Sequence, residues 1–240
     1  MKGVILAGGF GTRLRPLTTV TNKHLLPVFH KPMIYYPIET LKEAGVTDIM
    51  IVTGGENIGD FLKLLGSGKD LGVSFTYKYQ DGAGGVPAAL ALAKDFVGDD
   101  KCVVILGDNV MEESIREHVD GFAASGKGCR ILLKEVPDPE RFGIAEIRDG
   151  KIVATHEKMK SPVSSLAVIG VYMFDQKAFR IIPALRPSER GELEITHIIN
   201  EYIRNDDISH GIISGFWIDA GKLETLHEAS RFMAGKHLKG

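Results

Sequence analysis

Short apolar runs bounded by glycine alternate with segments of helical periodicity through the first half of this chain. The apolar runs predict strands over residues 3–7, 49–52, 73–79 and 102–106. The periodic segments predict helices over residues 33–44, 61–65 and 88–94. This alternation is typical of a mostly parallel sheet that helices cover on both faces, so we predict an α/β fold.

The second half changes character from about Arg130, because strand-like runs follow one another with fewer helices between them. We predict these strands over residues 131–136, 144–148, 151–155 and 167–174, a strand toward Trp217, and helices over 176–183, 194–204 and 223–233. The pair Asp149-Gly150 indicates a tight hairpin. We expect the strands to form an added antiparallel layer. Since no linker separates the halves, we predict one domain over residues 1–240, with lobes of about 1–130 and about 131–240 around a cleft.

The composition excludes several classes of partner. With 44% hydrophobic and 25% charged residues, the chain can bury a core, and its net charge of −2 gives no reason to expect a nucleic acid or an anionic membrane surface. No apolar segment is long enough for a membrane span. Cys102 and Cys129 lie far apart, which favours reduced thiols in the cytoplasm. A homo-oligomer stays open.

A glycine-rich segment, Leu6-Ala7-Gly8-Gly9-Phe10-Gly11-Thr12-Arg13-Leu14-Arg15-Pro16, follows the first predicted strand. Glycines here let backbone N–H groups approach phosphate oxygens, although a plain strand-to-helix turn would use the same residues. A dinucleotide fingerprint is excluded, because Leu14 stands where its third glycine belongs and Pro16 interrupts the expected helix.

A P-loop is mimicked by Gly121-Phe-Ala-Ala-Ser-Gly126-Lys127. Gly128 replaces the hydroxyl residue that would bind magnesium, and the segment follows a helix rather than a strand. We therefore interpret it as a helix C-cap turn. Metalloprotease and serine hydrolase classes lack support, because the sequence contains neither H-E-x-x-H nor G-x-S-x-G.

The glycine-rich segment and the following Lys23-His24-Leu25-Leu26-Pro27-Val28 resemble the signature of sugar-1-phosphate nucleotidylyltransferases. Lys31-Pro32-Met33-Ile34-Tyr35-Tyr36-Pro37 and Arg190-Gly191-Glu192-Leu193-Glu194-Ile195-Thr196 resemble the glucose-1-phosphate thymidylyltransferase branch. The resemblance spans nearly the whole chain. It implies the nucleotide-diphospho-sugar transferase fold, with a Rossmann-like mixed, mostly parallel sheet, flanking helices and a smaller antiparallel lobe that binds the sugar phosphate.

The chemistry of this family needs positive charge on a triphosphate, because the α-phosphate and the departing pyrophosphate must both be stabilised. Arg13 can bridge two phosphate oxygens and Lys23 supplies a point charge, and their place in the signature favours these roles over solvated surface positions. Gln80, by residue type alone, would be an exposed side chain. The nucleotide-binding set that the resemblance implies is Leu6, Ala7, Gly8, Gly9, Gly11, Thr12, Arg13, Gln80 and Gly85.

Two aspartates are candidates for a magnesium site. Asp108 follows a buried strand, at the edge where open α/β sheets bind ligands, although a helix N-cap would also suit it. Asp219 could equally be a turn former. Two carboxylates, completed by phosphate oxygens and waters, make a suitable shell for Mg²⁺. The resemblance assigns both aspartates to this role.

The pair Glu157-Lys158 is similar to the sugar-site pair of the family, in which the carboxylate accepts sugar hydroxyls and the lysine holds the phosphate. An exposed salt bridge is the alternative. The resemblance completes this pocket with Asn109, Gly143, Val168, Arg190 and Trp217. The chain departs from the family at Met159 and Ala220 and, most of all, in the base loop 80–89, which leaves the choice of base open.

These residues predict Mg²⁺-dependent transfer of a nucleotidyl group from dTTP or UTP to glucose 1-phosphate, with release of pyrophosphate. Alternatives are a pyrophosphorylase for another nucleotide or sugar 1-phosphate, and a non-catalytic subunit that binds nucleotide-sugars. The enzyme is favoured because every proposed catalytic residue is present: Arg13, Lys23, Asp108, Lys158 and Asp219. Since longer relatives carry regulatory C-terminal helices beyond the position of Gly240, we expect that regulatory site to be absent.

Overall fold

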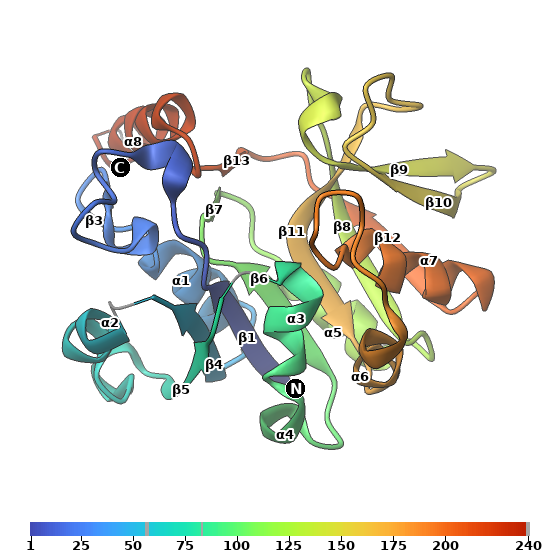
Figure 1. Cartoon of the computed structure of the whole chain (residues 1–240), viewed down its shortest axis with the longest axis horizontal. Helices are drawn as coiled ribbons and strands as arrows, with labels where there is room; N and C mark the ends of the chain where they lie inside the picture. The colour runs from blue at the N-terminus through green and yellow to red at the C-terminus, as the bar shows by residue number, and fades with distance from the viewer. Residues whose placement is uncertain (56–57, 83, 239–240) are drawn as a thin grey trace.

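A nine-stranded mixed sheet forms the centre of the computed structural model, which describes residues 1–55, 58–82 and 84–238 (Figure 1). Its strands are β1 (Lys2–Ala7), β4 (Asp48–Gly54), β5 (Ser74–Gln80), β6 (Cys102–Leu106), β8 (Cys129–Glu135), β9 (Gly143–Arg148), β10 (Lys151–Glu157), β11 (Leu166–Phe174) and β12 (Ile208–Ile212). They follow the order β10-β9-β11-β6-β1-β4-β5, and β8 pairs with both β11 and β12. Since β1, β4, β5 and β6 pair in parallel, the predicted α/β fold is confirmed.

Helices cover both faces of this sheet. Side chains along each buried strand therefore alternate between two hydrophobic cores, one on each face. Along β1, Val4 and Leu6 belong to one core, whereas Ile5 and Ala7 belong to the other. The first core packs against α3 (Gly85–Ala91), α4 (Lys94–Val97), α6 (Lys177–Ile181) and α7 (Ile195–Arg204). The second packs against α1 (Tyr35–Glu43), α2 (Ile58–Leu65) and α5 (Arg116–Ala124). Burial on both faces explains the continuous apolar runs in the sequence.

The strands β8, β9, β10 and β11 pair antiparallel, as predicted, but they extend the same sheet, so the expectation of a separate layer is wrong. Along one edge, β11 pairs with β6 through Val171–Phe174 and with β9 through Ala167, and along the other edge it pairs with β8. A strand this long, buried on both faces from Ala167 to Phe174, can serve both halves at once. The hairpin prediction is confirmed, since Asp149 and Gly150 have φ of 50° and 74° between β9 and β10.

Some helix boundaries differ from prediction. The helix predicted over 88–94 begins earlier, at Gly85, because Pro87 falls in its first turn, where a missing N–H costs nothing. The helix predicted over 176–183 divides at Pro183 into α6 and η5 (Ile182–Ala184). The last helix, α8 (Leu223–His237), continues past the predicted end at Met233. Ala83, in the predicted base loop, lies outside the described residues.

A third core joins the two ends of the chain. It packs Leu14, Val28 and Met33 against Ile218 and Leu226, so α8 lies on the segment that follows the glycine-rich loop (Figure 1). The short elements are η1 (Thr12–Leu14), η2 (Lys23–Leu25), β2 (Pro27–Val28), β3 (Lys31–Pro32), η3 (Lys69–Leu71), β7 (Asn109–Met111), η4 (Pro139–Arg141) and β13 (Trp217–Asp219).

The carboxyl ends of the parallel strands meet at one edge of the sheet, where Ala7 of β1 is in register with Thr53 of β4, and Leu6 with Leu106 of β6. The glycine-rich loop, Gln80 and Asp108 therefore all begin at this edge. Within the described residues, none of the helices has the length and apolarity that a membrane crossing requires.

Substitutions at two exposed glycines separate the effect of a left-handed backbone conformation from that of helix propensity. Gly150→Ala should lower the free energy of unfolding by about 1 kcal/mol, because φ of 74° is left-handed and disfavours a Cβ. Gly121→Ala, in α5, should raise it by about 0.5–1 kcal/mol through helix propensity. A Cβ at either position meets no atom within 4 Å. Urea denaturation of both variants measures the difference, and equal effects would contradict the hairpin conformation.

Candidate active site

Two adjoining cavities open at the carboxyl edge of the parallel strands. The first, of about 530 Å³, is lined by the end of β1, the loop after it, Gln80 and the start of α3. The second, of about 210 Å³, is lined by β9, β10, β11 and β13. Both cavities share a wall made by Arg13, Val86, Leu106, Asp108, Lys158, Arg190 and Glu192. A ligand spanning them would pass this wall, which carries five of the ten charged residues that line the two cavities.

Most of the predicted site residues line one or both of these cavities. The first cavity is lined by Leu6, Gly8, Gly9, Arg13, Lys23, Gln80 and Gly85. The second is lined by Asn109, Gly143, Glu157, Lys158, Val168, Arg190 and Trp217. Three predicted nucleotide residues line neither cavity. Ala7 points into the second core, Gly11 packs against Thr18 and Lys23, and Thr12 begins η1.

Gln80 is buried, so the alternative of an exposed glutamine is wrong. Its amide lies across Gly8, where a Cβ would stand 2.3 Å from Gln80 Oε1. At Gly54, a Cβ would stand 2.9 Å from the Gln80 carbonyl oxygen. Glycine is therefore required at position 54, where the close atoms are backbone oxygens, while Gly8 leaves room for the Gln80 amide at the wall of the first cavity.

The start of α3 is locked to the loop that precedes α7. Gly85 has φ of +83°, and a Cβ there would stand 2.2 Å from the Leu193 carbonyl oxygen. The Leu193 N–H in turn donates to the Gly84 carbonyl at 3.1 Å. This close backbone approach needs glycine at position 85 and brings the loop carrying Arg190 to the first cavity.

A two-stranded ribbon brings the two candidate metal ligands together. β13 pairs antiparallel with β7, placing Asp219 opposite Asn109, and the Ala220 N–H donates to the Asp108 carbonyl at 2.9 Å. A Cβ on Gly221 would lie 2.7 Å from Asp219 Oδ1, 3.2 Å from Asp108 Oδ2 and 3.4 Å from Arg13 Nη2. Two carboxylates and a guanidinium therefore converge around this glycine. Asp108 precedes a strand, so the N-cap alternative is wrong.

Lys23 balances the charge of this pair. Its Nζ forms an ion pair with Asp108 Oδ2, and both side chains are almost completely buried. Burial alone would raise the pKa of Asp108, but the Lys23 ammonium holds that pKa well below its usual range. Asp219, by contrast, has a pKa raised by burial and by the neighbouring Asp108 charge. Burial and Lys23 also lower the pKa of His24 to about 3, so its ring is neutral.

The two carboxylates suit a divalent cation whose remaining ligands come from outside the protein. Asp108 and Asp219 supply hard oxygen atoms, whereas groups of three or more His, Cys, Asp or Glu side chains suited to a metal are absent from the described residues. Mg²⁺ commonly binds one or two carboxylates and takes its other ligands from phosphates and waters. The raised pKa of Asp219 marks a repulsion that a cation between the carboxylates would relieve.

Arg190 lines both cavities and lies close to three glutamates. Arg190 contacts Glu157 at 3.0 Å, Glu194 at 3.4 Å and Glu192 at 3.8 Å, while Lys158 Nζ lies 3.7 Å from Glu157. Burial and the neighbouring Glu194 raise the pKa of Glu157. The alternative of an exposed salt bridge fits Lys158, whose side chain is 44% exposed, but not Glu157, at 20%.

A hydrogen bond links the two strands of the β7–β13 ribbon at the wall of the second cavity. Trp217 Nε1 donates to Asn109 Oδ1 at 2.6 Å, and the Trp217 ring meets Phe142 edge-on at 5.5 Å. Gly170 leaves room for the amide, since a Cβ there would lie 2.6 Å from Asn109 Nδ2. The indole face and the amide are therefore held rigidly beside Asp108.

Several lining residues escaped the sequence reasoning. Tyr172 is only 4% exposed, and its hydroxyl has no hydrogen-bond partner among the described residues, yet it lines the second cavity. It sits in an apolar strand and carries no local signal. Glu194 is buried at the start of α7 and accepts a hydrogen bond from Ser188 Oγ at 2.7 Å. The sequence signal that could have identified Glu194 is its position directly before a helical apolar pattern. Arg141 and Thr196 also line the cavity.

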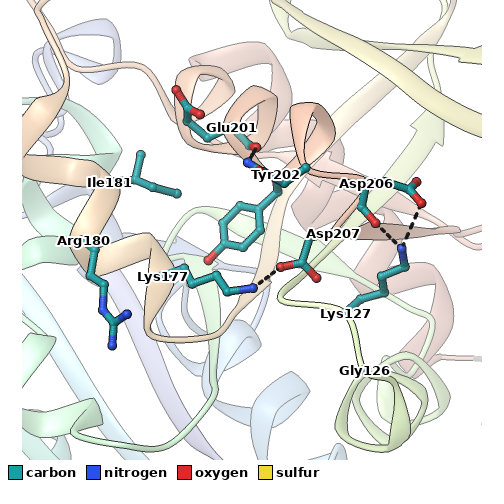
Figure 2. A pocket seen from close by; sticks show the side chains of 10 residues that line it. Gly126, Lys127, Lys177, Arg180, Ile181, Glu201, Tyr202, Asp206 and Asp207 are labelled. Atoms are coloured by element: carbon teal, nitrogen blue, oxygen red, sulfur yellow. Dashed lines mark hydrogen bonds and ion pairs between the residues drawn. The ribbon is translucent and has the colours of Figure 1, made fainter.

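A third hollow, of about 690 Å³, lies away from these cavities and contains Lys127 of the P-loop-like segment (Figure 2). Figure 2 shows Lys127 turned to Asp206 and Lys177 turned to Asp207, so acidic groups of the chain itself neutralise these lysines. The segment joins the end of α5 to β8. The interpretation as a C-cap turn is confirmed, and none of the predicted site residues lines this hollow.

The chain matches the nucleotidyl transferase family over residues 2–236 and therefore belongs to that family. It is 41% identical over 237 residues to a glucose-1-phosphate thymidylyltransferase of Neisseria meningitidis, which covers 97% of this chain and 82% of the relative. It is 43% identical to a low-salt glycan biosynthesis nucleotidyltransferase of Haloferax volcanii, over 97% of this chain and 66% of that protein.

Solved structures agree with this assignment. A Bacillus anthracis protein described as a glucose-1-phosphate thymidylyltransferase, in complex with sucrose, superposes with a TM-score of 0.93. It is 52% identical and covers 97% of this chain and 94% of its own. A UDP-glucose pyrophosphorylase complexed with UDP-glucose gives a TM-score of 0.87 at 25% identity, over 98% of both chains. The predicted nucleotide-diphospho-sugar transferase fold is confirmed.

The raised pKa of Glu157 predicts a pH-dependent cost to stability. The folded protein binds this proton more tightly than the unfolded chain does, so stability falls as pH rises above the ordinary glutamate pKa of 4.5. Glu157→Gln should therefore stabilise the protein relative to the wild type more at about pH 7 than at about pH 4. Thermal unfolding across this range tests it, with Glu192→Gln in the same loop as control. A pH-independent difference would contradict the prediction.

Proposed function

We propose that this protein transfers a nucleotidyl group from dTTP or UTP to glucose 1-phosphate and releases pyrophosphate. The observation that carries the proposal is the shared wall of the two cavities. Arg13, Asp108 and Lys158 belong to this wall. The first cavity also contains the Gln80 amide, and the second contains the Glu157 carboxylate. A nucleoside triphosphate in the first cavity and a sugar phosphate in the second would meet at this wall.

The first cavity suits a pyrimidine nucleotide. The amide of Gln80 offers a donor and an acceptor to a base edge, and the start of α3 at Gly85 forms the adjoining wall. The phosphates would lie along the glycine-rich loop, near Arg13 and Lys23. Since the described residues 1–130 supply most of this cavity, we assign the nucleotide to that lobe and the sugar phosphate to residues 131–240.

The reaction is an in-line displacement. An oxygen of the sugar phosphate attacks the α-phosphorus, a new P–O bond forms, and the bond to the β-phosphate oxygen breaks, so pyrophosphate departs. Lys158 holds the attacking phosphate and Arg13 stabilises the charge on the departing one. Asp108 and Asp219 would hold Mg²⁺, which would supply positive charge to the phosphate oxygens.

The relatives support the substrates. The Neisseria meningitidis relative is a glucose-1-phosphate thymidylyltransferase, and the pyrophosphorylase of similar fold was solved with UDP-glucose, so glucose and a pyrimidine base recur. Glu157 and Tyr172 would accept and donate hydrogen bonds to sugar hydroxyls in the second cavity. The buried free thiols of Cys102 and Cys129 support a reducing compartment, and we place the enzyme in the cytoplasm.

A substrate grid tests the function directly. Each nucleoside triphosphate is combined with glucose, galactose, mannose or N-acetylglucosamine 1-phosphate, and pyrophosphate release is measured with Mg²⁺ and with EDTA. We expect release only when both substrates and Mg²⁺ are present, fastest with dTTP or UTP and glucose 1-phosphate. Hydrolysis of the triphosphate that does not depend on any sugar phosphate would overturn the proposal.

Asp108→Asn separates an enzyme from a subunit that only binds nucleotide-sugars. The variant should lose about 100-fold or more in turnover, because it removes a charge at the reacting phosphates, while it still binds the nucleotide-sugar product. Asp206→Asn, whose parent side chain is 80% exposed in the third hollow, serves as control and should keep full turnover. Unchanged turnover in Asp108→Asn would exclude the assigned role.

A further inference from the structure

The ribbon that holds Asp108 and Asp219 together is short. Its strands β7 and β13 pair through three residues each, from Asn109 opposite Asp219 to Met111 opposite Trp217. They form a sheet of their own, apart from the nine-stranded sheet. Because an isolated pair of strands is only marginally stable in water, the position of the two aspartates depends on what holds the ends of this ribbon.

Backbone hydrogen bonds extend the β7–β13 ribbon by one step at each end. Beside the aspartates, the Ala220 N–H donates to the Asp108 carbonyl at 2.9 Å. At the other end, the Glu112 N–H donates to the Phe216 carbonyl at 3.0 Å. One strand then leads into α5, and the other is entered from β12. The two aspartates therefore lie at one end of a short ladder whose other end is the pair Glu112 and Phe216.

The side chain of Glu113 continues this ladder beyond Phe216. Its Oε2 accepts hydrogen bonds from the backbone N–H groups of Ser214 at 2.9 Å and of Gly215 at 2.8 Å, and from Ser214 Oγ at 3.3 Å. The segments touch here, since a Cβ on Gly215 would stand 3.1 Å from Glu113 Cβ. The hydrogen bond from Gly215 is the largest of the influences that lower the pKa of Glu113. An ionised carboxylate makes stronger hydrogen bonds than a neutral acceptor does, so this contact fastens the far end of the ribbon.

We propose that Glu113 is a positioning residue for the metal site. Its carboxylate holds the far end of the β7–β13 ribbon and so maintains the register that brings Asp108 and Asp219 together. A slip by one residue would turn the side chains of a strand to its other face, which would take Asp219 away from Asp108. Glu113 lines neither cavity and acts only through the ladder. The inference rests on the metal-binding role proposed above for the two aspartates.

Removal of the carboxylate tests this role with two measurements. Binding of Mn²⁺, as a paramagnetic substitute for Mg²⁺, is titrated by EPR without nucleotide, and NMR follows the exchange of the Ala220 N–H with deuterium. Glu113→Ala should weaken Mn²⁺ binding about 10-fold and speed exchange at Ala220 about 5-fold or more. Glu113→Gln keeps an oxygen that can accept from both N–H groups, so it should restore most of both values.

Glu112→Ala is the matched control, because the parent carboxylate faces Lys236 at 3.3 Å and the substitution keeps the backbone hydrogen bond to Phe216. It should leave both measurements unchanged. Thermal unfolding checks that each variant folds. If Glu113→Ala does not fold, Glu113→Asp takes its place, since its side chain is one methylene too short for the same contacts.

An unchanged Mn²⁺ dissociation constant in the folded variant overturns the inference. Unchanged exchange at Ala220 also overturns it, even where exchange at Ser214 and Gly215 becomes faster, because the carboxylate would then act only locally. Asp219→Asn is measured alongside. If that variant binds Mn²⁺ as tightly as the wild type, the proposed metal-binding role of the aspartates is wrong instead.

Discussion

The repulsion between the carboxylates of Asp108, which is buried, and Asp219, which is partly buried, is the constraint on which the site depends. Pairing of β7 with β13 holds Asp108 and Asp219 close to one point, and folding has to compensate for that proximity. Lys23 supplies the compensation at Asp108, whereas burial and the neighbouring Asp108 charge keep the pKa of Asp219 raised. The site is therefore arranged to receive positive charge, which is what a reaction between two phosphates requires.

Close backbone approach joins this centre to the two cavities. The glycines at 8, 85 and 170 make room for Gln80, for the Leu193 carbonyl and for Asn109 respectively. Each contact brings together segments that are distant in sequence. As a result, steric fit helps to position Gln80, the loop that carries Arg190 and the β7–β13 ribbon.

The sequence indicated most of the fold, because strands buried on both faces read as apolar runs and Asp149-Gly150 has the chemistry of one particular turn. It did not reveal that β11 would be shared by both halves, since pairing partners leave no local pattern. The same limit applied to the site. Motif residues such as Arg13 and Asp108 could be named, whereas Tyr172 looks like any core residue of an apolar strand until the cavity beside it is seen.

The sharing of β11 has a mechanical consequence. Its ladder ties β6, which Asp108 follows closely, to β8 and to β9, whose Gly143 lines the second cavity. Residues 1–130 and 131–240 cannot separate as rigid bodies without breaking this buried strand ladder, which would leave its hydrogen bonds without partners. We therefore expect access to the two cavities to depend on the loops and side chains that line them, such as Arg190.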